Sequence, residues 1–262
     1  MILTMNFYSF PAWSRVILFL CWQVKRSAKV LQYFSKFVPS APQRTGLIAL
    51  LVLLVPLFNT CAAETANIVC IVSDTHRWGA MSFTQTPAVQ TPHLETLAQQ
   101  GVSFSRHYVN LPICTPYRAL LMTGRWPYQQ GLIANHMSLA ERVDLPEGDQ
   151  TNGTLSWVFK HAGYTTALIG KWHLGGNDAR PFGFETSIVW GGTNNHRRSV
   201  YSIDGTPNVV WRGESNATAM TTQTLDLIDK VHGAGKPFFV VLSLNPPHGP
   251  FGDALEEKKE LY

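Results

Sequence analysis

NIVCIVS, at residues 67–73, is the stretch that decides how this chain folds. It is an uninterrupted apolar run rich in β-branched residues, which is typical of a short strand buried inside a parallel sheet. A helix is predicted next over TPHLETLAQQG, residues 91–101. Thr91 is its expected N-cap, and Gly101 is expected to end it. A strand followed by a helix predicts the opening of an α/β layer.

The same alternation continues along the chain. Strands are predicted at YTTALIG, residues 164–170, and at KPFFVVLSLN, residues 236–245. Helices are predicted at LSWVFKHA, residues 155–162, and at residues 217–233. Helices between apolar strands imply an α/β protein with a largely parallel sheet covered on both faces. No internal repeat or low-complexity linker interrupts residues 64–262, which we expect to form one continuous domain.

The composition is that of a folded protein rather than a disordered one. Of the 262 residues, 45% are hydrophobic and 15% are charged, which is enough apolar material for one substantial core. Residues 1–63 contain six of the 21 Lys and Arg residues and none of the 17 acids, so 15 bases face 17 acids from residue 64 onward. That balance, without a basic stripe, argues against a nucleic-acid partner.

The basic N-terminal part resembles a targeting segment. Gly46–Phe58 is an apolar run of 13 residues that follows Arg44, and Cys61 and Ala63 are small residues at the −3 and −1 positions of a cleavage site after Ala63. This pattern predicts a signal peptide over residues 1–63 and a secreted, periplasmic or extracellular protein. The run is shorter than the roughly 18 residues of a membrane-spanning helix. A retained anchor is therefore the weaker alternative, and membrane contact is expected only through the leader.

Ionisable residues follow three of the predicted strands. Asp74 comes directly after residues 67–73, Lys171 and His173 follow the strand that ends at residue 170, and His248 follows the strand that ends at residue 245. Each alone is more simply a solvated loop residue or a structural histidine. Ligands of parallel α/β sheets gather beyond the carboxyl ends of the strands, so the joint placement predicts a site there.

Cys114 is the one cysteine in a reactive setting. Cys21 and Cys61 fall in the leader and Cys70 falls in an apolar strand, so the cysteines do not form a disulfide framework. Cys114 precedes the apolar helical run YRALLMTG, which would place its sulfur near free N–H groups at a positive helix end. That setting suggests a thiolate nucleophile, although no histidine in the sequence is tied to it as a base.

Two motifs then resemble a known family. CTPYRALLMTGR, residues 114–125, resembles the first signature of the type I sulfatases, which has a Cys-x-Pro-x-Arg core followed by an apolar helix and Thr-Gly-Arg. GYTTALIGKWHLG, residues 163–175, resembles the second signature. The likeness extends to the family's metal loop, to its first helix with the strand that follows, and to the strand that delivers a sulfate-contacting histidine, at residues 67–78, 91–110 and 237–251.

The resemblance implies a fold as well as an activity. It implies an alkaline phosphatase-like three-layer α/β sandwich with a mostly parallel central sheet. Residues 176–216 carry no family motif, and we expect them to shape the substrate pocket. The sequence ends at Tyr262, before the Asp-Asn metal pair and the second sulfate-binding lysine of the family. The expected organisation is therefore a leader over residues 1–63 and an incomplete, C-terminally truncated sulfatase catalytic domain over residues 64–262.

The same resemblance implies an unusual nucleophile at Cys114. In the family a formylglycine-generating or sulfatase-maturing enzyme oxidises this cysteine to formylglycine, whose aldehyde becomes hydrated. One hydroxyl attacks the sulfur of the ester, and the second drives collapse back to the aldehyde with release of sulfate. By resemblance, Asp74 and the residue made from Cys114 are metal ligands for Ca²⁺ or another divalent cation.

The neighbouring residues acquire roles by resemblance. Arg118 would hold the hydrated aldehyde, and Lys171 would bind the sulfate. His173 would take the proton that triggers collapse. His248 would contact the sulfate and the leaving oxygen, as general acid. The expected substrate is a sulfated small molecule or carbohydrate.

The sequence departs from the family pattern at two positions, and two alternative functions stay open. Thr75 stands where the family often has a second aspartate, and Tyr117 stands where a small residue is usual. A phosphate or phosphonate ester hydrolase of the same superfold is one alternative, and a truncated, non-catalytic sulfatase homologue is another. Other polar residues were predicted to lie on the surface or in loops, namely His76, Arg77, His93, His107 and the run at residues 194–198.

Overall fold

The computed structural model describes residues 65–84, 89–141, 153–191, 195–212 and 215–260. The predicted leader at residues 1–63 lies outside them. Within the described ranges, no helix combines the length and the hydropathy needed to cross a membrane.

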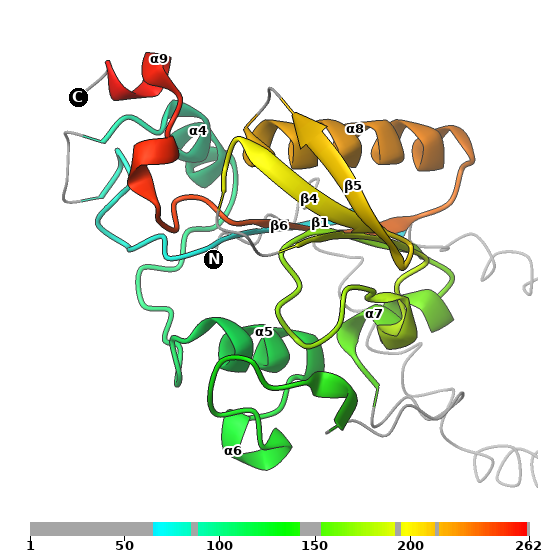
Figure 1. Ribbon diagram of the computed structural model, residues 1–262. Helices are drawn as coiled ribbons and strands as arrows, with labels where there is room; N and C mark the ends of the chain where they lie inside the picture. Colours follow the sequence, from blue (N-terminus) through cyan, green and yellow to red (C-terminus); the bar gives the residue numbers. More distant parts are fainter. Residues whose placement is uncertain (1–64, 85–88, 142–152, 192–194, 213–214, 261–262) are drawn as a thin grey trace, which may run out of the picture. The chain divides into compact units, whose positions relative to one another are not determined.

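A six-stranded sheet with the order β1-β6-β2-β3-β4-β5 forms the centre of the described part (Figure 1). The first four strands in this order are mutually parallel, and the last two are antiparallel to their neighbours. The predicted mostly parallel sheet is therefore confirmed. The strands are β1 (Ile68–Ser73), β2 (Thr165–Gly170), β3 (Thr186–Trp190), β4 (Arg198–Ile203), β5 (Thr206–Arg212) and β6 (Phe238–Leu244).

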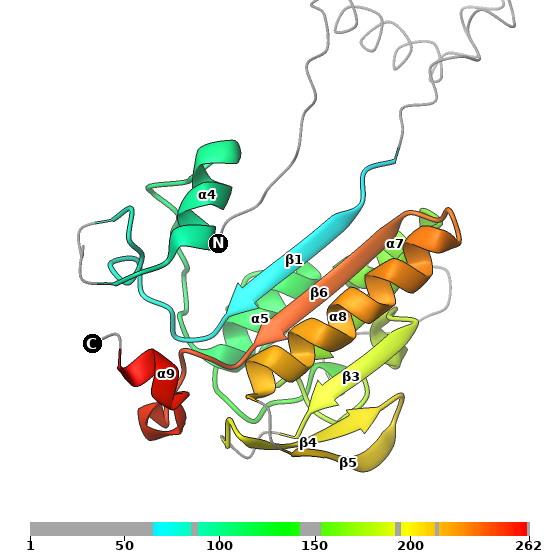
Figure 2. The same ribbon diagram turned by 90° about the horizontal axis from the view of Figure 1, so that it is seen from above.

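Helices cover both faces of the sheet, as predicted. The helix α8 (Asn216–Gly233) runs along β6 on one face, whereas α5 (Cys114–Thr123) and α7 (Leu155–His161) lie on the other (Figures 1 and 2). Side chains of β6 alternate between the two resulting cores. Phe239 and Val241 belong to the core beneath α5 and α7, and Val240 belongs to the core beneath α8. This is a three-layer α/β arrangement.

The remaining helices are short and peripheral, and α4 differs from its prediction in one detail. Thr91 is the N-cap residue of α4 but makes no side-chain cap, because its hydroxyl accepts a hydrogen bond from the backbone N–H of Ser82 instead. The peripheral helices are α4 (Pro92–Gln100), α6 (Pro127–Gln130) and α9 (Glu256–Lys259), and the 3₁₀ turns are η1 (Leu139–Glu141), η2 (Arg180–Phe182) and η3 (Phe251–Asp253).

The segment that follows α4 is not the strand that the family resemblance implies. Residues 102–110 are irregular, and Val102 and Phe104 are exposed. The implied strand is wrong for this structure because the segment pairs with none of the six described strands, and a lone strand has no partner for its backbone groups.

The first strand is less buried than its sequence predicts. Among the described residues β1 has a single neighbouring strand, β6, so it forms an edge of the sheet. The helix α8 lies over β6 and not over β1 (Figure 2). Val69 is 40% exposed and Ile71 is 49% exposed on this uncovered face. An apolar run cannot distinguish a central strand from an edge strand, because that depends on its neighbours.

A close approach of two backbones fixes the carboxyl ends of β2 and β6. Gly170 ends β2 with φ at +112°, and a Cβ placed there would lie 2.1 Å from the carbonyl oxygen of Ser243. The next N–H, of Lys171, donates to the same carbonyl over 2.8 Å. A glycine is therefore required at residue 170, both for its positive φ and for the space.

The substitution Gly170→Ala tests this constraint. We expect it to lower the free energy of unfolding by more than about 3 kcal/mol, because the methyl group strains the backbone and separates β2 from β6. Gly124→Ala is the matched control, since Gly124 has φ at +65° but nothing within 4 Å of the added atom. Gly124→Ala should lower the free energy of unfolding by only about 1–2 kcal/mol. If urea unfolding showed that the two variants lose the same free energy of unfolding, the close-approach explanation would be contradicted.

Candidate active site

The structure brings the predicted strand-end residues to one edge of the sheet. β6 lies between β1 and β2, and Ser73 pairs with Leu244 while Gly170 pairs with Ser243. The three strands therefore end at the same level. The segments that carry Asp74, Lys171 and His248 leave the sheet side by side, as the parallel arrangement predicted.

Asp74 is the centre of a buried ion-pair cluster. Its Oδ2 lies 2.5 Å from Nζ of Lys171 and 3.3 Å from Nη2 of Arg118, and all three side chains are almost fully buried. Burial alone would raise the pKa of Asp74, but the hydrogen bond from Lys171 and the charges of Arg118 and Lys171 outweigh it and hold the pKa below its ordinary value. Asp74 is therefore ionised at neutral pH, and the cluster carries an excess positive charge.

Cys114 is the first residue of α5, with Ile113 as N-cap, so it lies in the helix and not just before it as predicted. Its Sγ donates weakly to the two carboxylate oxygens of Asp74 over 3.7 and 3.8 Å. Nζ of Lys171 donates to the same sulfur over 3.9 Å. The sulfur thus lies beside the ion pair of Lys171 and Asp74 and contacts both of its members.

Arg118 follows Cys114 by one helical turn and ties α5 to two strands. Its Nη1 donates to the carbonyl oxygen of Lys171 over 2.8 Å and to Oγ of Ser243 over 2.5 Å. The Ser243 hydroxyl in turn donates to the carbonyl of Lys171 over 2.7 Å. Arg118 is therefore held in place by β2 and β6 as well as by Asp74.

Sequence reasoning missed two polar residues of β6 and the loop after it. Ser243 accepts from Arg118, and Asn245 accepts from Nζ of Lys171 through Oδ1 over 3.3 Å. Both side chains are buried. The signal for them was present in PFFVVLSLN, where two polar residues break an otherwise apolar strand sequence. Buried polar groups need partners, so such interruptions point to a network.

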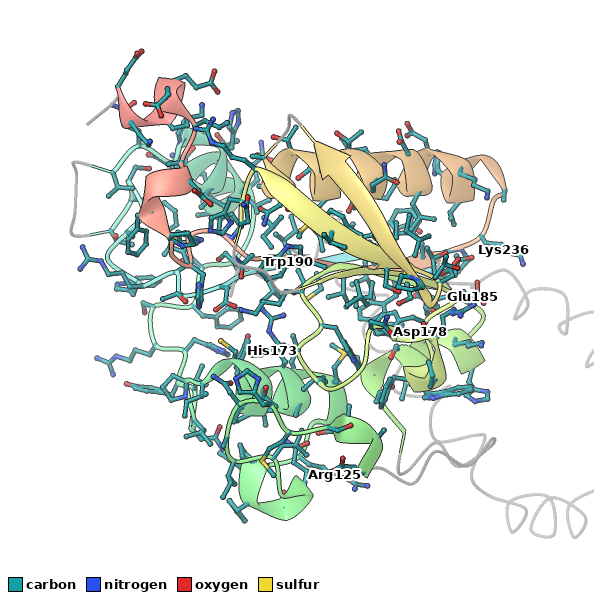
Figure 3. The ribbon with its side chains drawn as sticks, viewed as in Figure 1. Arg125, His173, Asp178, Glu185, Trp190 and Lys236 are labelled. Carbon is teal, nitrogen blue, oxygen red and sulfur yellow. The ribbon has the colours of Figure 1, made fainter. Side chains whose placement is uncertain are left out.

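His173 lies beside α5 (Figure 3) and is held there by its backbone, since its carbonyl accepts from Oγ1 of Thr115 over 2.9 Å. Its φ is +58°, an uncommon conformation for a residue other than glycine. Burial, together with the charges of Lys171 and Arg118 and the nearby His136, lowers the pKa of His173 to about 4. His173 is therefore neutral at pH 7 and can accept a proton.

His136 is a third residue that the sequence did not single out. Its ring packs edge-on against that of His173, with centroids 5.5 Å apart, and its φ is +65°. It is exposed, so it forms part of the surface around the buried cluster.

His248 shares the strand end but is not in the ion-pair cluster. Its backbone N–H donates to the carbonyl of Asn245 over 3.0 Å, and its Nδ1 lies 2.7 Å from the carbonyl oxygen of Gly249. A carbonyl only accepts, so Nδ1 carries a hydrogen and Nε2 is the ring atom free to exchange a proton. The ring is half-buried.

The residues in the described ranges do not by themselves complete a cation site. No group of three His, Cys, Asp or Glu residues is placed to hold a metal ion within those ranges. Asp74 is the carboxylate of the cluster, and Lys171 and Arg118 already neutralise it. Thr75, with φ at +58°, donates its hydroxyl to Asp74 over 3.2 Å. Ca²⁺ takes six to eight oxygen ligands, so this donor set falls short.

Comparison with known proteins assigns the class. The chain matches the Sulfatase family over residues 66–261. It is 31% identical over 204 residues to an ulvan-active sulfatase of Formosa agariphila, which covers 75% of this chain and 38% of that protein. It is also 31% identical over 219 residues to the N-acetylgalactosamine-6-sulfatase of Mus musculus, covering 72% of this chain and 41% of that protein.

Solved structures agree with the sequence comparisons. The yidJ protein of Bacteroides fragilis superposes with a TM-score of 0.66 at 26% identity, covering 76% of this chain and 47% of that one. BT4656, solved with its substrate D-glucosamine-2-N,6-O-disulfate, superposes with a TM-score of 0.59 at 28% identity, covering 71% of this chain and 35% of that one.

The chain therefore belongs to the sulfatase family and has its alkaline phosphatase-like fold. This confirms the class and the fold that the two sequence motifs indicated. The chain spans about two fifths of the length of the curated relatives described above.

Ser243→Ala tests the network that holds Arg118. We expect a loss of about 1–3 kcal/mol in the free energy of unfolding, because a buried guanidinium loses an acceptor. Ser202→Ala is the control, since the Ser202 hydroxyl is buried without a hydrogen-bond partner among the described residues. It should change stability by less than about 0.5 kcal/mol. A control as destabilising as Ser243→Ala in urea unfolding would show that the network is not responsible.

The neutral state of His173 predicts a pH effect on stability. The unfolded residue has the ordinary pKa of 6.5 and the folded one about 4, so the unfolded state binds more protons between these values. The His173 contribution to stability is complete above about pH 6.5 and is lost as the pH falls toward 4. Lys171→Met should raise the His173 pKa in an NMR titration, because it removes a positive charge. An unchanged His173 titration would refute the electrostatic cause.

Proposed function

We propose that this chain carries the catalytic half of an enzyme that hydrolyses sulfate esters through a formylglycine made from Cys114. The observation that carries the proposal is the position of Cys114 Sγ, which contacts both the Asp74 carboxylate and the Lys171 ammonium group at the end of three parallel strands. Family membership supports the reaction class. The phosphate or phosphonate alternative has less support, because both curated relatives described above are sulfatases.

In this proposal a formylglycine-generating or sulfatase-maturing enzyme first oxidises the CH₂SH group of Cys114 to an aldehyde. That enzyme supplies the two-electron oxidant, an oxygen replaces the sulfur, and the sulfur leaves as hydrogen sulfide. Hydration of the aldehyde gives a carbon with two hydroxyl groups, and Sγ stands in the structure where one of these oxygens would lie. A hydroxyl there would donate to Asp74, which draws the proton away and makes the oxygen more nucleophilic.

The first step would transfer the sulfuryl group to the enzyme. The hydroxyl oxygen attacks sulfur, the bond from sulfur to the alcohol oxygen breaks, and Nε2 of a protonated His248 supplies the proton that the alcohol takes. Lys171 and Arg118 supply fixed positive charge, which stabilises the anionic group during transfer. The net positive cluster therefore suits a sulfate monoester better than a neutral ester.

The second step would release sulfate without hydrolysis of the covalent ester. His173 accepts the proton of the remaining hydroxyl, the C–O bond to sulfate breaks, and the aldehyde forms again. With its pKa lowered to about 4, the ring of His173 is neutral at pH 7, which is the protonation state that a proton acceptor needs. Addition of water to the aldehyde restores the starting state.

A divalent cation, Ca²⁺ by family resemblance, would be held by Asp74 and by the residue made from Cys114. It would supply charge compensation at the sulfate. The described residues provide too few oxygen ligands to complete the site, so we route no step through it.

A sulfated carbohydrate is the substrate class that the comparisons favour over a small sulfated molecule. The substrate in the BT4656 complex is a sulfated glucosamine, and one relative is an N-acetylgalactosamine-6-sulfatase. The leader predicted at residues 1–63 supports secretion toward such a substrate, with membrane contact only through that leader and no role for nucleic acid.

The proposal is tested on the full-length protein co-produced with a formylglycine-generating enzyme. We expect mass spectrometry to find the aldehyde at residue 114 and turnover of an aryl sulfate with no comparable turnover of the aryl phosphate. Cys114→Ala should abolish turnover. Cys114→Ser should give at most one turnover per enzyme, because a serine ester lacks the second hydroxyl.

Cys70→Ala is the matched control for these variants, since Cys70 lies in β1 and should not change turnover. An unmodified Cys114 and no hydrolysis of any sulfate ester would support the non-catalytic alternative. Preferred turnover of the phosphate ester would support the other alternative.

A further inference from the structure

His196 lies where the sequence did not predict it. It belongs to the run at residues 194–198 that was expected on the surface, yet it is only 6% exposed. His196, two residues before β4, is linked to two other parts of the chain, the start of α8 and the loop after β6. That loop carries His248.

The backbone of His196 is fixed on both sides. Its N–H donates to Oδ2 of Asp253 over 3.1 Å, and its carbonyl accepts from the N–H of Asn216 over 2.7 Å. Asp253 ends η3, and Asn216 is the first residue of α8. These two backbone hydrogen bonds help to position the imidazole ring, in addition to the contacts that the ring itself makes.

Both ring nitrogens of His196 have partners. Nε2 lies 2.9 Å from the carbonyl oxygen of His248, and Nδ1 lies 3.3 Å from Nδ2 of Asn216. A carbonyl only accepts, so Nε2 must carry a hydrogen. An amide nitrogen only donates, so Nδ1 must be the acceptor. These two contacts are satisfied together by the neutral Nε2–H tautomer.

The opposite orientation of the Asn216 amide would require a charged ring. Oδ1 would then face Nδ1, and both ring nitrogens would need hydrogens. The Asp253 carboxylate contacts the backbone N–H of His196 and not its ring, and Arg197 is a cation that donates to the carbonyls of Asp253 and Ala254. A buried charge without a partner is costly, so the neutral tautomer is favoured.

We propose that His196 is a positioning residue for His248. Its Nε2–H holds the His248 carbonyl, while the His248 ring holds the next carbonyl, that of Gly249, through Nδ1. The two contacts fix the peptide groups on either side of Gly249. The ring is thereby oriented with Nε2 free for the ester oxygen. This inference rests on the proposed function in one respect, the role assigned to His248.

The test uses a matched pair of substitutions in the full-length protein. In His196→Gln the side-chain amide places an N–H near the position of Nε2. In His196→Asn the shorter side chain places its amide only near the position of Nδ1. His232→Ala removes an exposed histidine in the last turn of α8 and is the control. Each is compared by NMR of the histidine ring signals and, in the active enzyme, by kcat and KM for an aryl sulfate.

We expect the wild-type protein to show the Nε2–H tautomer at His196 in ¹H–¹⁵N spectra. His196→Asn should shift the His248 ring signals and lower kcat about tenfold to a hundredfold with a smaller change in KM, because the general acid is misplaced. His196→Gln should leave the His248 signals close to those of the wild-type protein and should retain most of the wild-type kcat. His232→Ala should change neither.

Two results would overturn the inference: an Nδ1–H tautomer at His196, or His248 ring signals and kcat that are the same in His196→Asn and His196→Gln. The NMR measurements do not depend on turnover. If the protein with the wild-type sequence and formylglycine at residue 114 hydrolyses no sulfate ester, the proposed function fails. The His248 signals in the Asn and Gln variants still decide whether His196 positions that loop.

Discussion

The buried carboxylate of Asp74 is the constraint on which the rest of the site depends. It accepts from Lys171 and Arg118 in a region where all three side chains are nearly inaccessible to solvent. Two cations without that carboxylate would be expensive to bury, so β1, α5 and β2 must meet at this point. Ser243 completes the arrangement from β6, because it binds both Arg118 and the backbone of Lys171.

The same charges account for the chemistry that the site can support. Two cations against one carboxylate leave a positive field, which suits an anionic ester at the position of Cys114 Sγ. Together with burial, that field lowers the pKa of His173 to about 4, so the imidazole stays neutral beside it. Anion binding and proton acceptance therefore come from one electrostatic cause, and a change in the cluster would alter both.

The proposed general acid depends on a different set of interactions. His248 is outside the ion-pair cluster, and its loop is attached through His196 to Asn216 at the start of α8. The rigid sheet thus orients the proposed nucleophile and the proposed sulfate-binding groups, while contacts between loops orient His248. Loops supported by such contacts are where variation among relatives is expected to act first.

The sequence by itself determined the alternation of strands and helices, the polar residues after the strands, and the spacing that puts Arg118 one turn after Cys114. These are local patterns, set by periodicity and by the chemistry of neighbouring residues. Only the tertiary structure decided that Ser243 would meet Arg118, 125 residues away in sequence, and that His196 would be buried against His248. Such pairs depend on the order and register of the strands and on the paths of the loops, which no local pattern encodes.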